Sequence, residues 1–208
     1  MESYYRSLGG PEVWQDVISL LIEGEVGFVD GDSLHFSHYR MKPDLSKSVI
    51  RLPNGFEIIQ CFDGNVSWEW LTFSSYESNV MLPEQSVEFV RDACFGSHLV
   101  FPQLADKKLI YHGAEMIDGL LLHRIEVILP NGQKIKYGLN SSGYLIEEET
   151  RVNKGERIRR LVFSGFKRIS GMTMPYEGKI YYDDELVQTV RITSIHINKG
   201  VYSWMFQM

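Results

Sequence analysis

The chain has 208 residues, a hydrophobic content of 44% and a formal net charge of −6. A negative net charge disfavours nucleic-acid binding, which requires a basic surface, so we expect no nucleic-acid partner. No apolar run reaches the roughly 18 residues that a membrane-spanning helix needs. Because the length suits one large domain, and no linker, repeat or low-complexity tract interrupts it, we predict a single domain over residues 1–208.

The N-terminal sequence shows no signal peptide. Met1 is followed by "ESYYRSLGG", which lacks a basic segment and a following apolar one. We therefore expect either a cytoplasmic protein or one from which a targeting segment has been removed. Cys61 and Cys94 do not decide between these locations, since they either form a disulfide in an oxidising compartment or remain two buried thiols.

Two segments carry the signals of helices. Residues 9–24, "GGPEVWQDVISLLIEG", place a proline at a first-turn position and a glycine at a stop position. An apolar stripe at spacings i, i+3, i+4 and i+7 runs through this segment: Trp14, Val17, Ile18 and Leu21. Residues 82–96 place Pro83 at the first helical position and Gly96 at the exit, which predicts a second helix.

Most of the remaining chain predicts strands, because apolar and polar residues alternate between frequent turn signals. Asn-Gly and Asp-Gly pairs at these turns tolerate the positive φ that hairpins require. The strand pattern continues to the C-terminal residues 200–208. A series of hairpins forms an antiparallel sheet, since a parallel sheet needs crossover helices. The acidic runs at 147–150 and 183–185 lie near turns, and we expect them to be solvated.

The predicted fold is mainly β (α+β): a strongly curved antiparallel sheet that forms an incomplete barrel closed by short helices. A long sheet with one apolar face must bury that face and protect its edges. Beside the turn "FDGN", four side chains share parity and are expected on the concave side, unless the turn shifts the register: Phe62, Val66, Trp68 and Trp70. The two tryptophans are either walls of a cavity or core residues beneath the helices.

Five stretches in a fixed order resemble the LolA-like family of periplasmic lipoprotein carriers. The family includes outer-membrane lipoprotein-sorting relatives and mycobacterial-type lipid-binding lipoproteins. The stretches are "YYRSLGGPEVWQDVISLLIEGEV" at 4–26, "MKPDLSKSVIRLPNG" at 41–55, "CFDGNVSW" at 61–68, "HGAEMIDGLLLHRIEVILPNGQKIKYGLNSSGYLI" at 112–146 and "FSGFKRISGMTMPYEGKIYYDDELVQTVRITSIHINKGVYSWMF" at 163–206. The resemblance implies an apolar cavity for acyl chains, a lipid or acylated protein as partner, and membrane-associated donor and acceptor proteins. It also implies export, and hence a periplasmic or outer-membrane-associated location.

In such a carrier we interpret residues 82–95 as a lid that packs on the cavity when it is empty and competes with cargo. Phe89, Val90 and Cys94 are expected to face inward. Together with the four residues around the turn at 62–65, they form the candidate ligand-binding set: Phe62, Val66, Trp68, Trp70, Phe89, Val90 and Cys94.

Catalytic and metal signals are weak. The sequence contains no Gly-x-Ser-x-Gly elbow, no His-Glu-x-x-His and no phosphate loop, so we expect neither an enzyme nor a cofactor. His35 and His38 are three residues apart, which places them on opposite faces of a strand and disfavours a shared metal. Two other function classes stay open: a protein-interaction or regulatory module of the same fold without lipid cargo, and an enzyme acting on a small apolar molecule.

Overall fold

The computed structural model describes residues 1–100, 106–117, 119–152 and 155–208. The helices are α1 (Glu2–Ser7), α2 (Pro11–Asp16), α3 (Pro83–Asp92) and the 3₁₀ helix η3 (Ser203–Phe206). The strands of the first half are β1 (Ser19–Phe28), β2 (Ser33–Met41), β3 (Leu45–Arg51), β4 (Glu57–Phe62), β5 (Ser67–Leu71) and β6 (Asn79–Val80). Those of the second half are β7 (Lys108–Ile117), β8 (Leu120–Ile128), β9 (Lys134–Asn140), β10 (Leu145–Val152), β11 (Arg157–Ser164), β12 (Lys167–Ile169), β13 (Met172–Met174), β14 (Glu177–Tyr182) and β15 (Glu185–Ile197).

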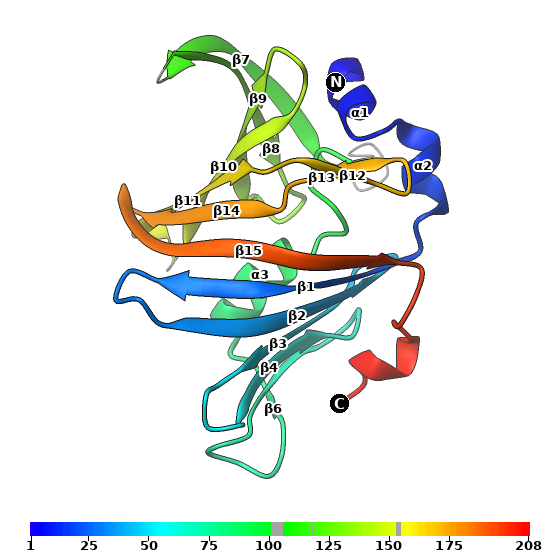
Figure 1. Cartoon of the computed structure of the whole chain (residues 1–208), viewed down its shortest axis with the longest axis vertical. Helices are drawn as coiled ribbons and strands as arrows, with labels where there is room; N and C mark the ends of the chain where they lie inside the picture. Colours follow the sequence, from blue (N-terminus) through cyan, green and yellow to red (C-terminus); the bar gives the residue numbers. More distant parts are fainter. Residues whose placement is uncertain (101–105, 118, 153–154) are drawn as a thin grey trace. The chain divides into compact units, whose positions relative to one another are not determined.

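Among the described residues, thirteen strands form one antiparallel sheet in the order β6-β5-β4-β3-β2-β1-β15-β14-β11-β10-β9-β8-β7 (Figure 1). Strands β12 and β13 form a separate hairpin. Within that part of the chain, β6 and β7 are the edge strands and do not pair with each other, so the sheet is not closed into a barrel. The predicted fold class, mainly β with an open antiparallel sheet and a few short helices, is confirmed.

The chain divides into two compact units. The first comprises Met1–Gln15 and Ser97–Thr189, and the second comprises Asp16–Gly96 and Val190–Met208. Strand β15 contributes to both, since the boundary falls within it. The assignment of residues 1–208 to a single domain stays a prediction.

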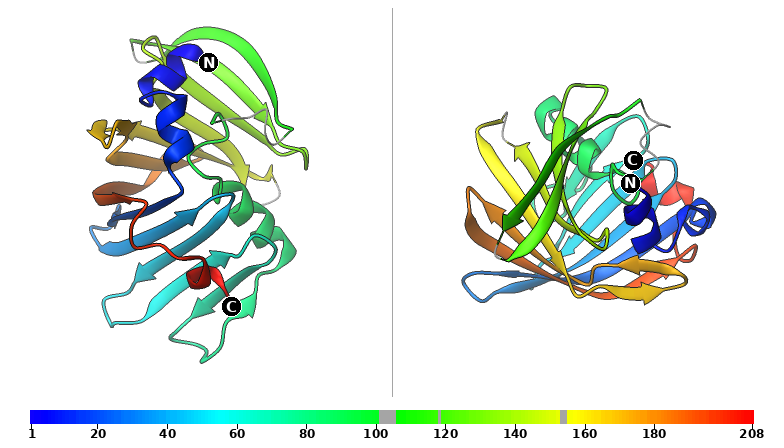
Figure 2. Two further views of the ribbon diagram at one scale, coloured as in Figure 1. Left: turned by 90° about the vertical axis from the view of Figure 1, so that its right-hand side faces the viewer. Right: turned by 90° about the horizontal axis from the view of Figure 1, so that it is seen from above.

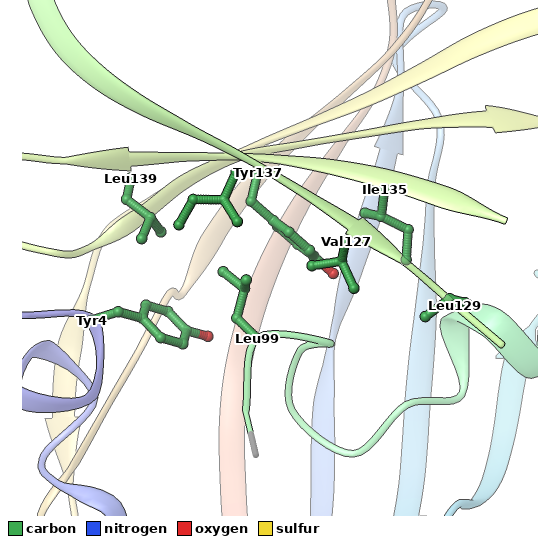
Figure 3. Packing of buried hydrophobic residues seen from close by; sticks show 8 residues of the cluster. Tyr4, Leu99, Val127, Leu129, Ile135, Tyr137 and Leu139 are labelled. Carbon is green, nitrogen blue, oxygen red and sulfur yellow. The ribbon is translucent and has the colours of Figure 1, made fainter. Parts of the chain in front are cut away.

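The core of the first unit lies on one face of β8 and β9. On this face alternate side chains of the two strands, such as Val127 and Tyr137, are fully buried. Tyr4 of α1 and Leu99 cover them, and Figure 3 shows both side chains directed at those of the strands. The first unit is therefore a sheet with one short helix and one loop segment packed on its apolar face.

The sheet of the second unit has two differently covered faces, which follow from the strand register. The face that we call the α3 face carries the apolar residues Leu20, Ile22, Phe36, Ile50, Ile58, Phe62 and Leu71 together with the polar residues His38, Arg40, Ser46, Ser48, Gln60, Ser67 and Glu69. The opposite face, which we call the C-terminal face, carries Val49, Ile59, Cys61, Trp68 and Trp70. Phe206 of η3 and Val201 pack on the C-terminal face, with 1% and 6% of their surfaces exposed.

Two element predictions are partly wrong. The N-terminal helix α2 begins at Pro11 as predicted but ends at Asp16, and strand β1 follows from Ser19. Gly24 lies within β1 and is no helix stop. A side chain there would lie 2.3 Å from the carbonyl oxygen of Arg191 and 2.7 Å from the ring of Phe36, so the glycine provides room for both. At the C-terminus, Ser203–Phe206 form a 3₁₀ turn in place of the predicted strand.

Candidate functional site

Helix α3 is placed as the sequence predicts. It begins at Pro83 after the N-cap Leu82, because proline suits a position whose N–H has no partner within the helix. Ser86, Phe89, Val90 and Ala93 follow the i, i+3, i+4, i+7 spacing of one helix face. Ser86 Oγ donates a hydrogen bond of 3.0 Å to Ser67 Oγ, which directs this stripe toward the α3 face of the sheet. Figure 2 shows α3 beside the strands of the second unit.

The C-terminal end of α3 is held by a charged side chain. Arg40 of β2 donates through Nη1 to the carbonyl oxygen of Cys94, just beyond the last helical residue. A cation at this end also complements the negative pole of the helix dipole. The polar contacts of α3 with Ser67 and Arg40 thus fasten it near each of its ends.

The α3 face carries both apolar and polar side chains, and its apolar side chains are incompletely covered. Leu20 and Phe36 are buried there, with 1% and 6% of their surfaces exposed. The other apolar side chains of this face are only half-buried: Ile22, Ile50, Ile58, Phe62 and Leu71. Phe89 and Val90 of α3 are likewise half-buried, although they belong to the inward stripe. The second unit therefore offers a partly accessible apolar surface on the side where α3 sits.

A titratable group lies on this face. Burial, and secondarily the positive charge of Arg40, lowers the pKa of His38 from 6.5 to about 3. The ring of Phe36 lies 4.8 Å from the His38 ring, centroid to centroid. His38 is consequently neutral at physiological pH, so it adds no charge to the α3 face.

The tryptophans do not share a face with Phe62, so the expected common orientation is wrong. Phe62 pairs with Ser67, whereas Trp68 pairs with Cys61 and therefore points the other way. The physical reason is the turn of residues 63–66: its length makes position 67, and not 68, the same-face neighbour of Phe62. Asp63 Oδ1 fixes this turn by accepting hydrogen bonds from the backbone N–H groups of Asn65 at 2.8 Å and Val66 at 2.7 Å.

Trp68 is a core residue of the C-terminal face. Its indole Nε1 donates to the carbonyl oxygen of Phe206 at 3.2 Å, and the Cys61 thiol lies 3.3 Å from the same oxygen. Trp68 is 4% exposed and Cys61 is fully buried. Of the two interpretations of Trp68, the structure supports packing, beneath the C-terminal segment instead of α3.

Trp70 lies at the rim of a hollow on the C-terminal face. The hollow measures about 490 Å³, and its lining includes Trp68, Trp70, Lys47, Tyr76 and Met208. Trp70 Nε1 donates to the carbonyl oxygen of Ser75 at 2.8 Å. The sequence-predicted set thus separates into Phe62, Phe89, Val90 and Cys94 on the α3 side, Trp68 and Trp70 on the other, and Val66 in the turn.

The acidic run at 147–150 forms ion pairs, which corrects the expectation that it is solvated. Glu147 is 6% exposed, and its carboxylate oxygens lie 2.8 Å from Arg124 Nη1 and 3.7 Å from Arg160 Nη1. Glu149 lies 3.1 Å from Lys136 Nζ. These carboxylates are neutralised by partners on neighbouring strands, which favours a structural role over a pair of catalytic acids.

The cysteines and histidines do not form a shared site. Cys61 and Cys94 are both free thiols, and Cys61 lies on the C-terminal face. In the part of the chain that the structure describes, no three or more His, Cys, Asp or Glu side chains are grouped to hold a metal ion. No helix of the described chain has the length and apolar character needed to cross a membrane.

The polar residues that contact α3 are not predicted from the sequence. Arg40, Ser67 and Ser86 are single polar residues in a strand or helix, and no motif distinguishes them. The one available signal is the charge of Arg40 at the same parity as the apolar Phe36, because it predicts a cation on the face that also carries Phe36.

Comparison with solved structures identifies the fold. No protein-family model matches the sequence, and no curated protein matches it. Among solved structures, a LolA superfamily protein of Nitrosomonas europaea is 14% identical, with 100% of this chain and 97% of that chain covered and a TM-score of 0.68. A DUF1329 family protein of Desulfovibrio piger is 13% identical over 94% and 93% of the two chains, with a TM-score of 0.63. An outer membrane lipoprotein-sorting protein domain of Vibrio parahaemolyticus is 12% identical over 95% and 96%, with a TM-score of 0.60. The chain therefore has a LolA-like fold.

Proposed function

We propose that the chain is a non-catalytic carrier that binds the acyl chains of a lipid or an acylated protein. The binding surface is the α3 face, and α3 is the lid. The observation that carries this proposal is the incomplete burial of the α3 face, where apolar side chains such as Ile50, Ile58 and Phe62 remain half-buried on the side of the sheet that α3 contacts. Part of the C-terminal face of the same sheet, by contrast, is covered by Phe206 and Val201.

The energetics suit reversible binding. Burial of one methylene contributes about 0.8 kcal/mol, so a chain of about sixteen carbons contributes on the order of 12 kcal/mol before ordering costs. Displacement of α3 reduces this figure, because the contacts that close α3 must first be broken. A lid that competes with cargo thus permits both capture and release.

The proposed location is the bacterial periplasm or the outer membrane, and the proposed partners are membrane-associated proteins that donate and accept the cargo. The fold supports this choice, since one of its structural neighbours is described as an outer membrane lipoprotein-sorting domain.

A second candidate is a protein-interaction module without lipid cargo. Tyr202 and Trp204 favour it, because their rings stack with centroids 6.1 Å apart while 58% and 66% of their surfaces are exposed. Exposed aromatic side chains of this kind are common anchors at protein interfaces.

Lipid analysis and a pair of variants test the carrier. Native mass spectrometry of the purified protein, followed by solvent extraction, is expected to show bound lipid, and a fluorescent fatty acid should be displaceable. Val90→Glu places a carboxylate on the inward stripe of α3 and should weaken fatty-acid binding at least tenfold, because an ionised group is costly on an apolar surface. Val87→Glu is the matched control, since Val87 is 46% exposed on the same helix.

The outcomes separate the two candidates. A protein free of lipid that takes up no fatty-acid probe contradicts the carrier and favours the interaction module. Equal probe affinity in V90E and the wild type, with the fold retained, removes α3 from the site.

A further inference from the structure

The first unit contains a hollow that the proposed function does not use. It measures about 450 Å³ and lies among α1, the turn at residues 140–144 and the β12–β13 hairpin. Its lining includes the side chains of Arg6, Tyr144, Phe166, Arg168 and Thr173. In Figure 1 the β12–β13 hairpin runs beside the N-terminal helices, as the hydrogen bond from Thr173 N–H to the carbonyl oxygen of Leu8 at 3.2 Å requires.

The lining of this hollow is positively charged. Its described lining holds two arginines and no aspartate or glutamate, in a chain whose net charge is −6. Arg168 forms no ion pair within the described residues. Arg6 lies 3.2 Å from Glu2 Oε1, but both side chains are largely exposed, and an exposed i,i+4 pair stabilises little. Arg6 can therefore exchange Glu2 for another anion at small cost.

Two other hollows differ in the charge of their lining. The hollow at β7–β9 contains Arg124 and Lys136, but Glu115 and Glu149 line it as well and form ion pairs with them. The hollow on the C-terminal face contains Lys47 together with Glu77. Among the three described hollows, an excess of cationic lining is confined to the one beside α1.

The walls of the hollow are fixed by close backbone contacts. Ser7 Oγ lies 2.9 Å from the carbonyl oxygen of Gly143, which ties α1 to the turn at 140–144. Gly9 has a φ of +105°, and a side chain there would lie 2.0 Å from the carbonyl oxygen of Gly171. The glycine at position 9 thus permits the contact that brings the β12–β13 turn against α1.

Hydrogen-bond donors are arranged beside the cations. Arg168 and Thr173 are directly paired across the β12–β13 hairpin, so their side chains project from the same face. The rings of Tyr144 and Phe166 pack in a tilted arrangement, with centroids 4.9 Å apart, and form an aromatic part of the wall. A guanidinium group next to a hydroxyl group is suited to the oxygens of a phosphate, because guanidinium N–H donors match its geometry.

We propose that this hollow is a binding site for a phosphate group, carried either by a small soluble phosphoester or by a phospholipid headgroup. Arg6 of α1 and Arg168 of β12 bind the anion, and the hydroxyl of Thr173 donates to it. The proposal is independent of the carrier function, because it concerns the first unit and leaves α3 aside.

The test uses the full chain and three variants. Arg168→Gln and Arg6→Gln each remove one proposed ligand. Lys167→Gln is the matched control: it removes the same charge at the neighbouring position, but Lys167 projects from the opposite face of β12, where its Nζ lies 4.4 Å from the Tyr176 ring. Inorganic phosphate is titrated while the backbone amide signals of Gly9 and Thr173 are followed by NMR. Vesicles of phosphatidylcholine, with and without phosphatidylglycerol, form the second arm.

We expect a saturable shift of both amide signals in the wild type and in K167Q, and binding at least tenfold weaker in R168Q and R6Q. If phosphate alone binds, the ligand is a soluble phosphoester. If phosphatidylglycerol vesicles also bind in an Arg168-dependent manner, the ligand is a headgroup. No saturable shift, or an equal loss in K167Q and R168Q, overturns the proposal, since the second result indicates diffuse charge only.

Discussion

Removal of the Arg40 side chain's hydrogen bond is expected to raise the affinity for acyl chains. Arg40 donates to the carbonyl oxygen of Cys94 and thereby stabilises α3 in its closed position. Arg40→Met retains most of the aliphatic length but removes the donor and the charge. The closed state is weakened while no charged group is added to the apolar surface, which distinguishes this variant from V90E.

The magnitude follows from the contact that is lost. A hydrogen bond from a charged donor contributes about 1.5–3 kcal/mol, and a half-buried arginine lies at the lower end of that range. If the empty protein is mostly closed, apparent affinity is proportional to the open fraction. A loss of about 1.4 kcal/mol then corresponds to a tenfold gain in affinity.

Displacement of a fluorescent fatty acid measures this gain directly. Arg51→Met is the control, because Arg51 has the parity of the C-terminal face and pairs with Glu57 at 3.3 Å, away from α3. Affinity that is unchanged or reduced in R40M, with thermal unfolding that confirms a folded protein, would refute the closed-lid reasoning.

Two further predictions concern titration and thiol chemistry. The unfolded chain protonates His38 below pH 6.5, whereas the folded chain does so only near 3, so this group's contribution to stability is lost as the pH falls through that window. Urea titrations measure the free energy of unfolding at pH 7 and pH 5. Between these two values the wild type should lose about 2 kcal/mol more than His38→Gln, and equal losses would contradict the prediction. Burial raises the pKa of Cys61 to about 12, so in the native protein at pH 8 a thiol reagent should modify Cys94 alone. Modification of two thiols per chain before unfolding would contradict this, because it would show that Cys61 is accessible.

The elements of the fold are largely predictable from the sequence, since turn residues and alternation locate the hairpins. Pro83 identifies the start of α3 because its ring suits only the first turn of a helix. The assignment of Leu20 to Ile22 to a helix is wrong, because three consecutive apolar residues fit a helix stripe and also a strand covered on both faces.

The candidate site is less predictable, because side-chain orientation depends on the register across each turn. The turn at 63–66 reverses the relative orientation of Phe62 and Trp68, and the sequence does not determine that register. The contacts of Ser86 with Ser67 and of Arg40 with Cys94 join residues distant in the sequence, so no local pattern indicates them.

A disulfide between α3 and β5 tests the central claim most directly. The hydroxyl oxygens of Ser67 and Ser86 are 3.0 Å apart, so sulfurs at these positions lie close enough to bond after a small adjustment. The double variant S67C/S86C is made with Cys94→Ser to prevent mispairing, and disulfide formation is verified by mass. The oxidised protein should bind no fatty-acid probe. Reduction should restore binding to at least the level of C94S alone, because the reduced variant also lacks the hydrogen bond between Ser67 and Ser86. Equal binding by the oxidised and reduced forms would contradict the account, because acyl chains would then bind without displacement of α3.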